Sequence, residues 1–308
     1  MTLFVGIASY ARPRAFKLSL YSLVRTKIVK GIIAIVDARN IVEKEKYIEA
    51  LNIVRNYGLE VVHDIYTVKR GFVFARNRVL DLAEDLLNSS DILILYDDDY
   101  VCPDMQALIP AKIWLEKSQD IGLVGGRVVD LHRRQIDPDF YLDMVPGIAD
   151  TLSRITGFVF LDARHGPRYT VFTLPLRALR VKVIKHGVRF DPEFKGTGYR
   201  SEDDFNMQIA KLGYKIVIDP RFWAYHLNLE HGGCRIENLV SRFYWKTRNH
   251  TYYMLKYRMA LHKIILSNMI IIIYAYLHGV RTFISALKGL KDALNTYLYV
   301  KDTKRMRR

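Results

Sequence analysis

Short apolar runs alternate with helix-like segments over the first hundred residues, and this alternation is the strongest constraint on the fold. The runs at residues 3–8, 31–36, 59–62 and 91–96 have the length and composition of buried strands. Between them lie stretches whose apolar residues recur three or four positions apart, as on one face of a helix. Strands that alternate with helices form a mostly parallel sheet covered on both faces. We therefore expect an α/β fold with a mostly parallel central sheet flanked by helices.

Beyond residue 120 the pattern is less regular. The sequence predicts strands at residues 121–124, 170–183 and 214–218, the last ending at an Asp-Pro pair. It predicts a helix over residues 201–212 and a loop over residues 130–150. No internal repeat or low-complexity linker interrupts the chain.

Positive charge is concentrated at the C-terminal end. The chain has 308 residues and a formal net charge of +15, and residues 231–308 contain 15 Lys and Arg against three acids. Basic excess of this kind favours contact with phosphate, in lipid head groups or in nucleic acid. We therefore divide the chain into a main domain over residues 1–235 and a helical basic appendage over residues 236–308.

The appendage contains a 14-residue apolar stretch at residues 264–277. A membrane-spanning helix needs about 20 such residues, so we expect a helix that lies in the membrane interface, with a buried or dimer-contact helix as the alternative. The N-terminus resembles no secretory signal, and two isolated cysteines suggest neither a disulfide framework nor a thiolate zinc site. We expect a cytoplasmic protein, peripheral at the cytoplasmic face of a membrane.

Polar side chains collect where the predicted strands end. Ser9 and Tyr10 end the first strand, Asp37 ends the second, and Asp97-Asp98-Asp99 follow the fourth. Ligands of open parallel sheets bind at these carboxyl ends. Three adjacent carboxylates repel one another, so a fold that retains them usually supplies a cation, and Mn²⁺ or Mg²⁺ beside a diphosphate fits this need. The alternative is a solvated acidic turn that caps the next helix.

A second acidic group, Glu202-Asp203-Asp204, opens the helix predicted after a glycine-flanked loop. One of these carboxylates could take a proton from an incoming hydroxyl, although acids in a first turn also cap helices. His226 lies among aromatic residues and is either a packing residue or a third metal ligand. Arg76, on a predicted helix, is either a surface charge or a diphosphate contact.

The ordered set of motifs resembles a family 2 glycosyltransferase of the GT-A fold, which is Rossmann-like. The matching residues run through the first 230 positions: Val5 to Tyr10, Arg12-Pro13, Asp37, Gly71, Ala75-Arg76-Asn77, the aspartate triplet, Phe190-Asp191, Ser201-Glu202-Asp203, Gly213-Tyr214 and His226. The resemblance implies the following roles: donor-nucleotide binding by Ser9, Tyr10, Arg12, Asp37, Arg76 and Asp98, metal binding by Asp97, Asp99 and His226, general-base catalysis by Asp203, and acceptor contacts by Glu202 and Asp204.

The resemblance also implies a reaction. A sugar would pass with inversion from a nucleotide-diphosphate donor to a hydroxyl of a glycan, a lipid-linked sugar or a protein, with a divalent metal and Asp203 as the base. A metal-dependent nucleotidyltransferase or phosphotransferase is the first alternative, but it leaves Glu202-Asp203 and His226 without a common role. A non-enzymatic nucleic-acid-binding protein is the second alternative. We expect no nucleic-acid partner, because the basic region is predicted to form a pair of apolar helices and not a polar stripe with stacking aromatic residues.

Overall fold

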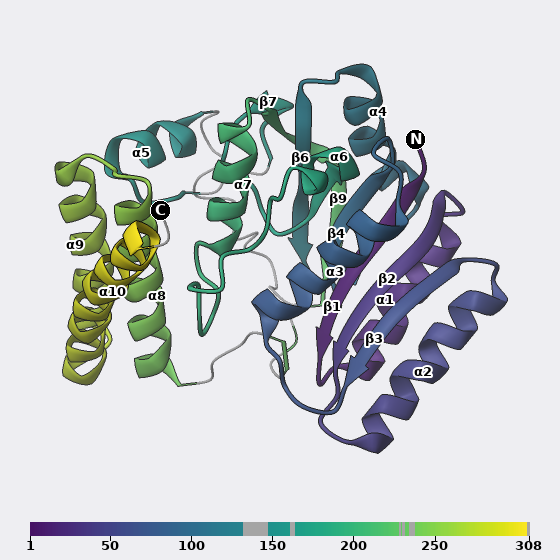
Figure 1. The fold of residues 1–308 in the computed structure, drawn as a ribbon, viewed down its shortest axis with the longest axis horizontal. Helices are drawn as coiled ribbons and strands as arrows, with labels where there is room; N and C mark the ends of the chain where they lie inside the picture. Colours follow the sequence, from purple (N-terminus) through teal and green to yellow (C-terminus); the bar gives the residue numbers. More distant parts are fainter. Residues whose placement is uncertain (132–146, 161–163, 228, 230–231, 234–237, 307–308) are drawn as a thin grey trace.

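One sheet organises the molecule (Figure 1). The computed structural model describes residues 1–131, 147–160, 164–227, 229, 232–233 and 238–306. Within these residues nine strands form the sheet in the order β3-β2-β1-β4-β8-β6-β9-β5, and β7 pairs with β9. The strands are β1 (Leu3–Tyr10), β2 (Val29–Asp37), β3 (Glu60–Tyr66), β4 (Ile92–Asp97), β5 (Tyr100–Val101), β6 (Ile121–Asp130), β7 (Arg168–Tyr169), β8 (Arg177–Arg180) and β9 (Lys215–His226).

The first half of the sheet is parallel, as the alternation of strands and helices predicts. β1 pairs in parallel with β2 and β4, and β2 pairs in parallel with β3. Antiparallel β8 then joins β4 to β6, and β6 runs parallel to β9. The α/β fold class is confirmed. The helices around the sheet are α1 (Pro13–Arg25), α2 (Ile41–Asn56), α3 (Phe72–Leu86), α4 (Ile109–Lys117), α5 (Ile148–Thr156), α6 (Val181–Lys185) and α7 (Ser201–Lys211), with a 3-10 turn, η1 (Met105–Ala107), before α4.

Helices bury an apolar core on both faces of the sheet. On one face, Phe16 of α1 and Tyr47 of α2 pack against the sheet and are fully buried. On the other face, Val79 of α3 joins a second core that includes residues of α6 and α7. Gly6 is needed on that second face, because a Cβ there would lie 2.3 Å from Val79 Cγ1. Close packing of α3 on β1 follows, and it holds the start of α3 near the carboxyl ends of the strands.

Two predicted strands differ from those observed. Only Arg177–Arg180 of the predicted strand at residues 170–183 is extended along the sheet, and the helix α6 begins at the next residue. Conversely, β9 does not end at its Asp-Pro pair but continues to His226. Its register with β6 shifts between Gly125 and Arg127, which absorbs the proline that cannot donate to a ladder. The expected loop at residues 130–150 lies mostly outside the described residues, and α5 begins at Ile148.

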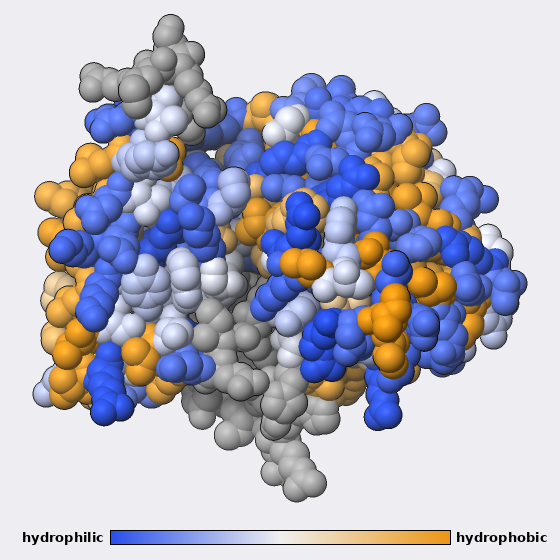
Figure 2. All heavy atoms as spheres, turned by 60° about the horizontal axis from the view of Figure 1, so that its bottom comes forward, coloured by the Kyte–Doolittle hydropathy of each residue, from blue (hydrophilic) through white to orange (hydrophobic). Residues whose placement is uncertain are grey.

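Three helices form the appendage: α8 (Leu239–Lys256), α9 (Leu261–Leu277) and α10 (Val280–Met306). They lie side by side next to α7, at one end of the sheet (Figure 1). Side chains of α9 and α10 leave an apolar edge on the surface (Figure 2). Within the part of the chain that the structure describes, no helix combines the length and hydropathy needed to cross a bilayer.

A buried charged cluster fastens α8 to the main domain. Lys256 Nζ lies 2.7 Å from Asp191 Oδ2 and 2.5 Å from Asp204 Oδ1, and the Tyr257 hydroxyl donates to Asp204 Oδ1 at 2.9 Å. Asp204 is completely buried, so its charge depends on these partners. The appendage is therefore packed into the main domain through α7.

Replacing Lys256 by Met should destabilise the protein, because it leaves the fully buried Asp204 and the half-buried Asp191 without their shared cation. We expect the free energy of unfolding to fall by about 3 kcal/mol, as for other buried ion pairs that lose one partner. Urea denaturation followed by circular dichroism would measure it, with the exposed Lys291→Met as the matched control. Equal midpoints for the two variants would contradict the role of the cluster.

Candidate active site

The parallel strands bring the predicted polar residues to one edge of the sheet. β1 and β2 pair so that Tyr10 lies opposite Asp37, and β1 and β4 pair so that Ala8 lies opposite Asp97. His226 ends β9 and lies opposite Tyr100 of β5, close to the triplet. Residues more than two hundred positions apart in the sequence therefore meet at the carboxyl ends of the strands, as expected for this fold class.

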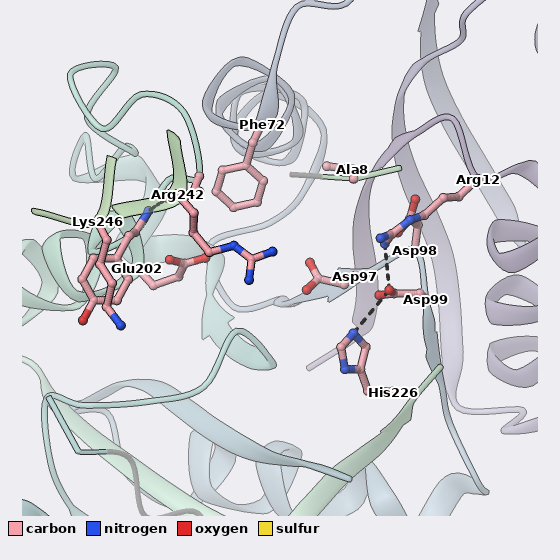
Figure 3. A pocket seen from close by; sticks show the side chains of 13 residues that line it. Ala8, Arg12, Phe72, Asp97, Asp98, Asp99, Glu202, His226, Arg242 and Lys246 are labelled. Carbon is pink, nitrogen blue, oxygen red and sulfur yellow. Dashed lines mark hydrogen bonds and ion pairs between the residues drawn. The ribbon is translucent and has the colours of Figure 1, made fainter. Parts of the chain in front are cut away.

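A cavity of about 600 Å³ opens at this edge. Figure 3 shows the aspartate triplet with Arg12 and His226 on one side, and Glu202, Arg242 and Lys246 across from them. Its lining residues are Ala8, Arg12, Phe72, Asp97, Asp98, Asp99, Thr197, Tyr199, Glu202, His226, Gly233, Arg242 and Lys246.

Arg12 neutralises two of the three aspartates. Its Nη1 donates to Asp99 Oδ2 at 2.7 Å and to Asp98 Oδ1 at 3.3 Å, and its Nη2 donates to the Gly232 carbonyl at 3.1 Å. All three charged side chains are buried. Burial and the charge of Asp99 raise the pKa of Asp98, against the lowering effect of Arg12. The Ser9 hydroxyl also donates to Asp98 Oδ2, at 2.5 Å. Asp98 thus faces protein groups on two sides.

The three expected metal ligands line the same cavity, but they are not gathered into one ligand set. Asp97 forms an ion pair with Arg76. Asp99 Oδ2 lies 3.3 Å from His226 Nε2. Among the described residues, no three acidic, histidine or cysteine side chains converge at metal-ligand spacing. The donor set, two carboxylates and an imidazole that face one cavity, nevertheless has the chemistry that Mn²⁺ or Mg²⁺ requires.

The ionisation of His226 depends on the same acids. Burial lowers its pKa, but the hydrogen bond and the charge of Asp99 outweigh burial and raise the pKa overall. The ring also packs edge-on against Tyr100, with centroids 5.5 Å apart. His226 is therefore oriented by one carboxylate and one aromatic ring, and its role as a third metal ligand stays a prediction.

A neighbouring cavity of about 400 Å³ extends along β1, β2 and the start of α3. Asp37 Oδ2 accepts the backbone N–H groups of Arg70 at 2.7 Å and Gly71 at 2.9 Å, whereas its buried Oδ1 has no hydrogen-bond partner. Lys69 Nζ lies 4.3 Å from the centroid of the Tyr10 ring, which also lines this cavity. An unpaired buried carboxylate oxygen beside a cavity can accept a hydrogen bond from a ligand or from water, because leaving it unpaired costs free energy.

The three acids of α7 point in different directions. Glu202 lines the large cavity. Asp203 is not among its lining residues and accepts from Arg200 Nη1 at 2.8 Å. Asp204, expected on the acceptor side, is fully buried and bound to Lys256, which corrects that expectation. Successive helical residues lie 100° apart, so three neighbouring acids cannot all face one cavity.

Burial raises the pKa of Glu202, and Asp97 adds to this rise, whereas Arg177 and Arg76 lower it. Arg177 is itself buried, and its charge is favoured by Glu202 and Asp203 while burial lowers its pKa. The carboxylate of Glu202 is thus held between cations that favour its charge and a poorly solvated site that disfavours it. Such a group is suited to accept a proton.

Sequence reasoning did not identify the cavity residues that come from loops and from the appendage. Phe72 begins α3, and Thr197 and Tyr199 belong to the glycine-flanked loop before α7. Arg242 and Lys246 come from α8. Their spacing of four residues, which places them on one face of a helix, was the available signal.

The fold is shared with a known enzyme. Neither a protein-family model nor a curated protein sequence matches this chain. Among solved structures, the chain is similar to the mannosyltransferase PcManGT from Pyrobaculum calidifontis, solved with GDP-Man and Mn²⁺, with a TM-score of 0.56 and 14% identity over 99% of this chain and 79% of that one. S. aureus TarS gives a TM-score of 0.49 with 16% identity over 83% of this chain and 40% of that one.

Replacing Arg12 by Met should destabilise the protein, because two buried carboxylates then lose their cation. With a chelator present, the free energy of unfolding should fall by about 3 kcal/mol. Excess Mn²⁺ should recover more thermal stability in this variant than it adds to the wild type, since a cation can then replace the guanidinium. Differential scanning fluorimetry would show both effects, with the exposed Arg14→Met on the same helix as control. A melting temperature equal to that of the wild type would rule out this role for Arg12.

Proposed function

We propose that this chain is a glycosyltransferase that moves a sugar with inversion from a nucleotide-diphosphate donor to an acceptor hydroxyl. The observation that carries the proposal is a single cavity with an acidic triplet at the ends of parallel strands on one side and the carboxylate of Glu202 on the other. The fold shared with the mannosyltransferase supports it, because that enzyme was solved with a nucleotide sugar.

The donor nucleotide would occupy the smaller cavity. The unpaired Oδ1 of Asp37 suits an N–H or hydroxyl donor of a nucleoside, and the Tyr10 ring offers a surface for stacking. The diphosphate would then reach the large cavity, where Arg12 belongs to the lining and Arg76 pairs with the lining residue Asp97. We assign Ser9 and Asp98, which hydrogen bond to each other, to the wall between the two cavities.

A divalent cation, Mn²⁺ or Mg²⁺, would be held by Asp97, Asp99 and His226. When bound, such an ion offsets the charge that develops on the leaving diphosphate. Binding would require Arg12 to share or release Asp99, because its guanidinium lies 2.7 Å from the oxygen concerned.

We assign the general base to Glu202, which lines the cavity, and give Asp203, the base implied by the family resemblance, the role of holding Arg200. The acceptor oxygen forms a bond to the anomeric carbon while its proton passes to the carboxylate. The bond between that carbon and the diphosphate oxygen breaks, and its electron pair leaves with the nucleoside diphosphate. Attack opposite the leaving group inverts the anomeric centre, as in a direct displacement with one base.

A panel of nucleotide sugars incubated with the full chain and Mn²⁺ tests the proposal. We expect release of nucleoside diphosphate from one donor, and release of pyrophosphate would instead favour a nucleotidyltransferase. Glu202→Gln should lower kcat by about 10²- to 10⁴-fold, the usual contribution of a general base. The affinity for the nucleoside diphosphate, measured by calorimetry, should change little.

The matched variant Asp203→Asn separates the two acids. If Glu202 is the base, Asp203→Asn should lower kcat less than Glu202→Gln does. A near-complete loss in Asp203→Asn with near-normal turnover in Glu202→Gln would return the base to Asp203. Absence of nucleoside diphosphate release with every donor would contradict the proposed function itself.

We further propose that the appendage rests on the cytoplasmic face of a membrane. Exposed apolar side chains of α9 include Ile265 and Ile273, and Lys288 and Lys291 are exposed on α10. Apolar side chains beside basic ones suit an interface of anionic lipid.

The full chain should therefore float with anionic liposomes, float less with neutral ones, and bind less as salt increases. Ile273→Asp should weaken flotation, because a charge in the interface is costly. Retention on DNA at the same salt, without flotation, would favour the nucleic-acid-binding alternative.

A further inference from the structure

Lys246 is a cation in the large cavity without a carboxylate partner among the described residues. Its Nζ instead lies over three aromatic rings, 5.4 Å from the centroid of Tyr199, 5.7 Å from Phe158 and 5.9 Å from Tyr274. Arg242, one helical turn earlier, lines the same cavity. Figure 3 shows both side chains on the side of Glu202, across from the triplet. Two cations of α8 therefore face the place where an acceptor would enter.

The surroundings of Lys246 favour an anion. Lys246 is half-buried, and burial lowers its pKa, with further lowering by the charges of Arg200 and Arg242. The charge of Arg200 is offset by Asp203, but no acid among the residues described by the structure lies at ion-pair distance from Lys246. An ammonium in this position is stabilised by a ligand that brings negative charge.

The donor diphosphate is not suited to supply this charge. Its proposed partners, Arg12 and Arg76, lie with the aspartate triplet at the strand ends. Lys246 and Arg242 lie across the cavity and come from the appendage. An anion bound there belongs to the second substrate.

An apolar surface begins beside this cationic pair. Tyr274 contacts Lys246, is half exposed, and belongs to α9. Directly before it in the helix is Ile273, and residues spaced four apart from Ile273 lie on the same helical face. The exposed apolar side chains of that face are Ile265, Met269, Ile273 and Leu277, between 50% and 73% exposed. Tyr274 thus contacts the cation of the cavity, and the exposed apolar strip begins on the neighbouring face of the same helix, about 100° round its axis.

We propose that Lys246, together with Arg242, binds the phosphate of an amphiphilic acceptor whose hydrocarbon chain lies along the exposed face of α9. The inference rests on the proposed function, which it deepens by naming the acceptor class as a phosphate-bearing lipid. The phosphate only holds the acceptor; a hydroxyl near Glu202 remains the attacking group. The ion pair, formed in a half-buried site, gives charge-assisted hydrogen bonds of the stronger kind.

Binding of polyprenyl monophosphate in detergent micelles to the full chain tests this inference without a donor. We expect the affinity to fall at least about tenfold in Lys246→Met, the loss expected for a charge-assisted hydrogen bond. Lys246→Arg should retain most of the affinity, and Lys185→Met, at an exposed position of α6 far from the appendage in the sequence, should bind as the wild type does. Polyprenol, which lacks the phosphate, should bind weakly and equally to all four proteins. Equal binding of polyprenol and its phosphate to the wild type would overturn the inference.

Two further measurements distinguish the sources of the anion. Glycerol phosphate should compete poorly with the lipid phosphate. Ile273→Asp should weaken binding of the lipid phosphate but not of glycerol phosphate. Strong competition by glycerol phosphate would indicate a water-soluble acceptor and overturn the proposal of a lipid acceptor. A fall in nucleotide affinity in Lys246→Met, with lipid binding unchanged, would assign the lysine to the donor and also overturn the inference.

The lipid-binding result also stays separate from the proposed function. If no donor releases nucleoside diphosphate, the proposed function fails, but the binding measurement still shows whether Lys246 recognises a lipid phosphate. If a donor is turned over and Lys246→Met leaves lipid binding unchanged, only the inference fails. Melting temperatures of the variants, together with recovery in Lys246→Arg, exclude misfolding as the cause of lost binding.

Discussion

Charge compensation at the carboxyl ends of the parallel strands is the constraint on which the site depends. Asp97 ends the buried strand β4, Asp98 and Asp99 follow it, and a fold that buries Asp98 and Asp99 must bring a cation to them. Arg76 from α3 and Arg12 from the start of α1 supply these cations. The starts of α1 and α3 are therefore tied to the acids by the same contacts that compensate the charge of the acids.

These compensating cations also prepare the site for charged ligands. A guanidinium that already pairs with a carboxylate can turn toward a phosphate, and the carboxylate it leaves can accept a metal ion. The acid Asp37 shows the complementary arrangement, since one of its oxygens is held by two backbone N–H groups and the other is left without a partner. Polar groups that have hydrogen-bond partners and polar groups that lack one thus lie next to each other along the cavity.

The appendage takes part in the site. α8 is fastened through Lys256 to Asp204 of α7, and the same helix brings Arg242 and Lys246 to the cavity. Because Asp204 is held in this way, its neighbour Glu202 is turned to the cavity and Asp203 to Arg200. The ion pair between Lys256 and Asp204 does not face the cavity, yet it decides which of the three acids of α7 can contact a substrate.

The sequence by itself determined the parallel α/β architecture and the polar strand ends, because apolar periodicity and the position of strand termini are local properties of the chain. It also located Asp37, the triplet and His226, although it ended β9 too early at its proline. Only the tertiary structure decided that Glu202 rather than Asp203 lines the cavity, that Asp204 is a buried partner of Lys256, and that Arg242 and Lys246 belong to the site. The direction of a side chain on a helix depends on what the helix packs against, and the packing of α7 against α8 joins residues about fifty positions apart that no local pattern relates.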